Sequence, residues 1–102
     1  MAIKDLVVTR SFPKQILIDN DLPHEGNDEF EIVEDNMLYN TRWSLMHELI
    51  FKHEDKFYRT TYEVGATEMQ YMRPWKYVED VVCTEVEPIE VIVKRWKPVE
   101  VI

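Results

Sequence analysis

Histidine and carboxylate side chains are the groups of this sequence that could bind a metal ion or transfer a proton. His47 and Glu48 could begin an HExxH zinc motif, in which two histidines four residues apart lie on one face of a helix. Position 51 is a phenylalanine, however, and the next histidine is His53. The spacing fails, so we predict neither a zinc site nor a catalytic role for these histidines.

The acidic segment around Gly26 offers the hard oxygen ligands that calcium prefers. A calcium loop of the EF-hand type needs a glycine at its sixth position, a donor at its third and a bidentate glutamate at its twelfth. Placing Gly26 at the sixth position puts Pro23 at the third and Ile32 at the twelfth. We therefore predict a solvated acidic loop with no metal and no other cofactor, and we keep weak cation association as an alternative.

The only cysteine and a pair of glutamates complete the candidates for catalysis. Cys83 lies in the apolar run VVCTEV, where a neutral buried thiol is commoner than a thiolate. Glu85 and Glu87 share one face of that predicted strand, as residues on a solvated face commonly do. GxxxxGK[ST], GxGxxG and GxSxG do not occur in the sequence. We predict that the protein is not an enzyme, and a carboxylate enzyme with a divalent metal is the least favoured alternative.

Negative charge is concentrated in one block between residues 19 and 35. The chain has 20 acidic and 12 basic side chains and a net charge of -8, and this block has no lysine or arginine. Its acidic members are Asp19, Asp21, Glu25, Asp28, Glu29, Glu31, Glu34 and Asp35. Such a field attracts cationic partners and repels polyanions. Direct nucleic-acid binding is disfavoured for the same reason, since the densest basic cluster is Lys94, Arg95 and Lys97.

Two aromatic residues stand out as partner-binding candidates. Trp75 and Tyr77 follow Pro74 in a segment without regular periodicity, and we predict that they form a hot spot for protein binding rather than part of the core. A base-stacking platform is disfavoured because such platforms accompany cationic grooves.

Composition and hydropathy predict one small α+β domain, mainly β, that spans residues 1–102. About five mostly antiparallel strands surround a long hairpin, in which residues 43–52 and 56–64 are the arms and residues 53–55 lie near the turn. A helix over residues 44–52 is the alternative. We expect one or two extended segments over residues 1–18 and an exposed acidic loop within residues 19–35. We also expect a strand that begins at Phe30 and turns near Asp35 and Asn36.

The C-terminal half predicts one brief helix and two more strands. Thr67 and Gln70 have the spacing of a capping box, which opens a helical turn that Pro74 ends. Strands follow over residues 81–86 and 89–96, separated by Pro88. The apolar residues Val99, Val101 and Ile102 predict one of two arrangements. The C-terminus docks on the body of the protein, or the C-terminal strand pairs with a second copy to form a homodimer.

Four short motifs carry a resemblance to a protein group. RWS at 42–44, KFYR at 56–59, GATExQ at 65–70 and CTEV at 83–86 together resemble a pattern found in short uncharacterised bacteriophage proteins, over about residues 30–96. The resemblance implies a phage protein made in the cytoplasm of a bacterial host, and a single cysteine agrees with that reducing compartment. It implies no catalytic residue. No stretch approaches the ~20 apolar residues of a membrane span.

Two functions follow as hypotheses. The leading one is a non-enzymatic phage interaction protein, an inhibitor or modulator of a host protein with a basic surface. In that hypothesis, carboxylates of the acidic block take the place of phosphates in contacts with the basic surface, and Trp75 or Tyr77 supplies an apolar anchor. The carboxylates are those of Asp19, Asp21, Glu25, Asp28, Glu29 and Glu31. The alternative is a structural or assembly component that self-associates through its C-terminal strand.

Overall fold

Two ten-residue strands, β3 (Ser44–His53) and β4 (Lys56–Gly65), form the hairpin at the centre of the fold. Alternate side chains of this hairpin point into the core, and Leu49, Phe51 and Tyr58 are almost fully buried. Glu54 and Asp55 connect the strands with positive φ angles of 53° and 63°. A two-residue turn with this backbone matches the twist of the strands. The predicted hairpin is confirmed and the alternative helix is wrong.

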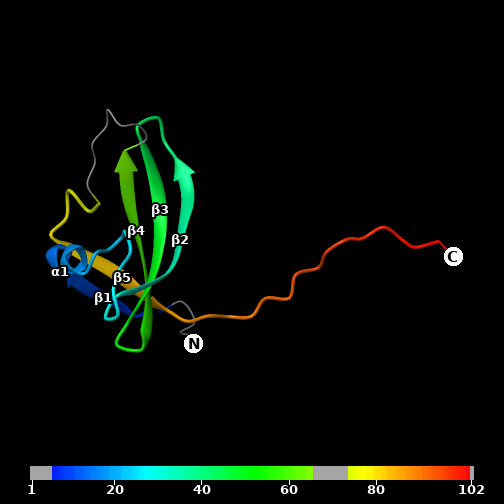
Figure 1. The fold of residues 1–102 in the computed structure, drawn as a ribbon, viewed down its shortest axis with the longest axis horizontal. Coiled ribbons are helices and arrows are strands. Elements are labelled where there is room, and N and C mark those ends of the chain that lie inside the picture. Colours follow the sequence, from blue (N-terminus) through cyan, green and yellow to red (C-terminus); the bar gives the residue numbers. More distant parts are fainter. Residues whose placement is uncertain (1–5, 66–73, 102) are drawn as a thin grey trace.

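The computed structural model describes residues 6–65 and 74–101, which form one five-stranded antiparallel sheet with one short helix (Figure 1). The remaining strands are β1 (Thr9–Pro13), β2 (Glu31–Asn40) and β5 (Asp80–Val86). Their order across the sheet is β1-β5-β4-β3-β2, with antiparallel pairing throughout. The predicted α+β, mainly β class is confirmed, as is the strand over residues 81–86.

The N-terminal part differs from its prediction because a helix follows the first strand. β1 ends at Pro13, and α1 (Lys14–Asp19) begins at the next residue. Only Leu17 of this six-residue helix is fully buried. Ile16 and Ile18 flank Leu17 and are exposed, so the apolar run that suggested an extended segment contributes one core side chain.

β2 also differs from its prediction, since it runs through Asp35 and Asn36 to Asn40 without a turn. Asp35 pairs with Leu49, and Asn36 pairs with Glu48. The turn comes instead at Thr41–Ser44, where the Thr41 amide donates to the Ser44 carbonyl at 2.8 Å. The Thr41 hydroxyl oxygen also accepts hydrogen bonds from the amides of Trp43 and Ser44. Trp43 was predicted to begin the first arm of the hairpin, but it lies in this turn and is exposed.

One face of the sheet carries the hydrophobic core. Phe12 packs edge-on against Phe30, Phe51 and Tyr58, with ring centroids 5.3–5.9 Å apart. The remaining core members include Leu17 of α1, Leu22 of the acidic segment, and Trp75, Val81 and Cys83 from the C-terminal half. The covering layer is thus formed by α1, the acidic segment and the segment before β5. Every residue of this core cluster lies between positions 12 and 83.

The C-terminal arm, residues 88–101, leaves the sheet as an extended chain (Figure 1). The prediction of a paired strand over residues 89–96 is wrong for the single chain, because these residues form no strand and every described arm residue is exposed. Docking of Val99 and Val101 on the body is wrong for the same reason. The large exposed apolar arm residues are Ile89, Val91, Ile92, Val93, Trp96, Val99 and Val101.

The predicted capping box at Thr67 and Gln70 lies outside the described residues. In the part of the chain that is described, no helix is long and apolar enough to cross a membrane.

Candidate interaction surfaces

The acidic segment, residues 19–35, is anchored at both ends by buried apolar side chains. Leu22 and Phe30 are 1% and 3% exposed and belong to the core. Between them the Asn27 side-chain oxygen accepts hydrogen bonds from the amides of Glu29 and Phe30, at 3.0 and 2.9 Å. Gly26 adopts a φ of 70°, a conformation that favours glycine. The predicted acidic loop therefore has a defined backbone, which continues into β2.

His53 fixes this segment to the central hairpin. Its ring stacks on Phe30 with centroids 3.9 Å apart and an interplanar angle of 16°. Its Nδ1 lies 2.7 Å from the Glu29 carbonyl oxygen, so the ring donates a hydrogen bond there. The role of His53 is thus to hold the acidic segment against β3.

All eight carboxylates of the acidic segment belong to exposed residues. Asp19 accepts a hydrogen bond from Gln15, and Glu34 accepts one from Asn36. Within the described residues, the ion pairs are Arg10–Glu54, His47–Asp35 and His53–Glu54. None of them joins the acidic segment to a lysine or arginine. The Asp35 carboxylate is bound to His47 of the hairpin, and the other seven carboxylates have no cationic partner within the described residues.

Part of this charge borders a polar hollow of about 510 Å³ between the acidic segment and the hairpin turn. Its lining consists of Asp28, Glu29, Glu31, Lys52, His53, Glu54 and Asp55. Glu54 is already engaged, because its 3.1 Å hydrogen bond from Arg10 lowers the pKa of the Glu54 carboxyl. Among residues 6–65 and 74–101, no three His, Cys, Asp or Glu side chains come together in a way that could hold a metal ion.

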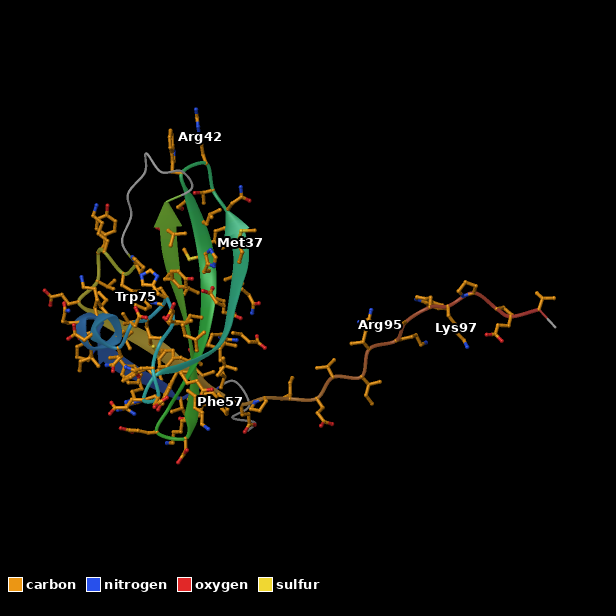
Figure 2. All side chains as sticks on the ribbon, in the orientation of Figure 1. Met37, Arg42, Phe57, Trp75, Arg95 and Lys97 are labelled. Atoms are coloured by element: carbon orange, nitrogen blue, oxygen red, sulfur yellow. The ribbon has the colours of Figure 1, made fainter. Side chains whose placement is uncertain are left out.

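The two aromatic candidates occupy opposite environments. Trp75 is 8% exposed, and its indole Nε1 donates a 2.9 Å hydrogen bond to the Thr61 carbonyl oxygen. Figure 2 places Trp75 against the body of the fold, beside the sheet. The structure therefore corrects the preference for a surface role, since the indole is held in the core by packing and by this hydrogen bond. Tyr77 is 81% exposed and is free to contact a partner.

Asp35, His47 and Tyr62 form a polar network that the sequence did not reveal. His47 Nδ1 lies 3.0 Å from Asp35 Oδ1, and the Tyr62 hydroxyl donates to Asp35 Oδ2. The rings of His47 and Tyr62 stack with centroids 5.1 Å apart. Desolvation, followed by the hydrogen bond to the Asp35 carboxylate, raises the pKa of Tyr62, so the phenol stays protonated.

This network resembles the way a carboxylate orients a histidine in acid-base catalysis. No serine, threonine or cysteine hydroxyl or thiol is hydrogen-bonded to His47 among the described residues. Its measurable role is to connect β2, β3 and β4. The network could have been predicted from the sequence if Asp35, His47 and Tyr62 had been recognised as polar residues on the inward face of three adjacent strands. The turn predicted near Asp35 excluded this residue from the sheet.

Cys83 is fully buried in β5, in agreement with its prediction as a core thiol. Desolvation raises the pKa of Cys83 to about 11, and its Sγ lies 3.7 Å from the Val81 carbonyl oxygen. A thiol in this state is a poor nucleophile at neutral pH.

The opposite face of the sheet has an apolar groove of about 390 Å³ at the root of the arm. Its apolar lining is Val33, Ile50, Phe57, Val86 and Pro88, and its charged lining is Glu34, Arg59 and Glu87. Figure 2 shows Phe57 at this end of the sheet, with Arg95 and Lys97 far out along the arm. Exposed apolar surface is therefore present on the arm and on the sheet.

Comparisons with protein families, with curated proteins and with solved structures returned no match.

Proposed function

We propose that this chain is a non-catalytic assembly component that self-associates through its C-terminal arm. The observation that carries the proposal is the exposure of seven large apolar side chains on the arm, among them Ile92 at 100% and Trp96 at 89%. An exposed apolar segment of this size marks a protein interface more often than free surface.

Burial of the apolar side chains offsets part of the cost of ordering the arm. Burying one valine, isoleucine or larger apolar side chain contributes about 1.5–3 kcal/mol. The backbone entropy lost when the arm becomes ordered is about 1–2 kcal/mol per residue, so the backbone hydrogen bonds of a paired strand must contribute as well. The β-branched residues of the arm also favour the extended conformation that strand pairing needs.

Sedimentation of the full chain and of a chain that ends at Glu87 tests this proposal. The shortened chain keeps the whole core cluster, which lies between residues 12 and 83, so it is expected to fold. We expect the full chain to form a dimer or larger assembly and the shortened chain to be monomeric. A full chain that stays monomeric at high micromolar concentration would refute the proposal.

A second candidate function is binding of a basic host protein by the acidic segment, as a phage-encoded inhibitor or modulator. The observation that favours it is the absence, within the described residues, of any lysine or arginine ion pair to this segment. Charge complementarity of this kind accelerates association and makes it dependent on salt.

Titration with an arginine-rich peptide tests the acidic-segment function separately. The variant Glu25→Gln, Asp28→Asn, Glu29→Gln and Glu31→Gln removes four exposed charges but keeps Asn27 and its hydrogen bonds. We expect its affinity for the peptide to fall at least tenfold, and we expect salt to weaken binding of the original chain. Equal affinity of the two proteins would remove this candidate.

A further inference from the structure

We infer that the C-terminal arm of one chain adds to the outer edge of β2 in a second copy, as a sixth antiparallel strand. This inference rests on the proposed self-association and names the surface that receives the arm. The occupant is residues 89–97 of the second copy, which lie between Pro88 and Pro98.

β2 provides a long open edge. It ends the sheet, and in the described part of the chain only its first residue, Glu31, has a further bridge, to Gly26. Register shifts at Val33 and Leu38 leave the regular stretch Glu34–Met37 between them. The unpaired backbone groups of an edge strand are a template for another strand. Residues 32–40 of β2 therefore offer nine positions to the nine arm residues, which all have an amide hydrogen.

The sequence patterns of the two strands match in the antiparallel direction. The first half of β2 contains the carboxylates Glu31, Glu34 and Asp35 around the apolar residues 32–33. Its second half contains the exposed side chains of Met37, Leu38 and Tyr39. The arm has the reverse order. Its first half, residues 89–93, is apolar apart from Glu90. Its second half, residues 94–97, consists of Lys94, Arg95 and Lys97 with Trp96 among them.

Antiparallel pairing therefore places the cations of the arm beside the carboxylates of β2, and apolar side chains beside apolar side chains. Arg95 opposite Glu34, for example, brings Ile92 opposite Met37. Cross-strand pairs of opposite charge and pairs of apolar side chains each contribute roughly 0.2–1 kcal/mol. Parallel pairing would set the apolar half of the arm against the carboxylates, so the patterns select the antiparallel direction.

The arm cannot reach this position on its own β2. One cross-strand row of the sheet consists of Glu31, Lys52, Phe57 and Val86. The arm follows Val86 almost directly, so it starts at the Glu31 end of its own β2. Antiparallel pairing needs Ile89 near the Asn40 end, which is about 30 Å away at 3.3 Å per residue. The connection from Val86 to Ile89 reaches only about 10 Å. The receiving strand must therefore belong to a second copy.

A charge-reversal experiment on the full chain tests the receiving surface. Variant A has Arg95→Glu and Lys97→Glu on the arm, and variant B has Glu31→Lys and Glu34→Lys on β2. We expect each variant alone to self-associate at least tenfold more weakly than the original chain. In an equimolar mixture, the reversed arm of A meets the reversed edge of B, so a one-to-one complex is expected to form.

A matched control keeps the charge change but moves it off the edge. Glu25→Lys with Asp28→Lys alters the same acidic segment by the same charge, outside β2. We expect this control to self-associate within about twofold of the original chain. Equal weakening by the control would mean general electrostatic attraction and would overturn the assigned surface.

Hydrogen exchange supplies an independent measurement. In the full chain, the outward-facing amides of Glu34–Met37 should exchange at least tenfold more slowly than in the chain that ends at Glu87. This inference would be overturned if the assembly depends on the arm but variant B associates normally and these amides gain no protection. The proposed function would still stand in that case. A monomeric full chain would overturn both.

Discussion

Tyr62 on β4 donates a hydrogen bond to Asp35 on β2, and the contact spans β3, which lies between the two strands. The His47 ring of β3 lies under this contact, stacked on Tyr62 and hydrogen-bonded to the same carboxylate. The network therefore connects the edge strand β2 to the hairpin through side chains as well as through backbone pairing.

Replacement of Tyr62 by phenylalanine should remove this connection while keeping the ring in the core. We expect Tyr62→Phe to lower the free energy of unfolding by about 1–2 kcal/mol, because a hydrogen bond to a charged, partly buried acceptor is lost. Denaturation by urea measures the change. Tyr39→Phe, on an exposed ring of β2, is the control and should stay within ~0.5 kcal/mol of the original chain.

Gly26 sets the path of the acidic segment into β2. A Cβ at this position would lie 2.3 Å from the Phe30 carbonyl oxygen, a backbone atom, and φ is already 70°. We expect Gly26→Ala to destabilise the fold by about 2–4 kcal/mol through left-handed strain and overpacking. Chemical denaturation checks the value, with the exposed His24→Ala as a control in the same segment. Equal stability of the two variants would show that the segment does not support the fold.

Trp75 and Tyr77 lie two residues apart and should separate core stability from surface binding. We expect Trp75→Ala to cost about 3–5 kcal/mol, as for other buried large side chains. Tyr77→Ala should change stability by less than ~0.5 kcal/mol, since the ring is exposed. Thermal and chemical unfolding of both variants checks the assignment, and a neutral Trp75→Ala would restore the surface role predicted from the sequence.

Burial of Cys83 predicts a stability that falls in alkali. The pKa of the thiol rises from 9.0 to about 11 on folding because the site is desolvated. The unfolded chain therefore releases the proton first, and stability is fully present below pH 9 and lost as the pH rises toward 11. Unfolding measured at intervals over this range should show a smaller loss for Cys83→Ala than for the original chain. Parallel losses in the two proteins would contradict the assigned cause.

The hairpin could be predicted because its evidence is local. Apolar and aromatic side chains recur at alternate positions in each arm, as Leu49 does in the first arm and Tyr58 and Tyr62 do in the second. The polar residues 53–55 separate the two arms at one place. Helix α1 could not, because six residues with Leu17 as the only buried position show no helical periodicity.

The candidate surfaces were predictable to different degrees. Net charge and exposure of the acidic segment follow from composition, but its anchoring by Leu22 and by the ring of His53 depends on distant contacts. The arm was predicted as a strand from its side chains alone. A strand also needs a neighbour, and in the single chain the segment has none within the described residues.

The position of the three arm cations has a consequence for the size of any assembly. Under the proposed pairing, an added arm becomes the new outermost strand and presents Lys94, Arg95 and Lys97 along the rim. A further arm that added parallel to the first would meet like charge, and one that added antiparallel would set its apolar half against these cations. Prolines 88 and 98 would interrupt its hydrogen bonding at both ends. Sheet growth would thus terminate after a single addition, and fibril formation would be suppressed by the same residues that bring two subunits together.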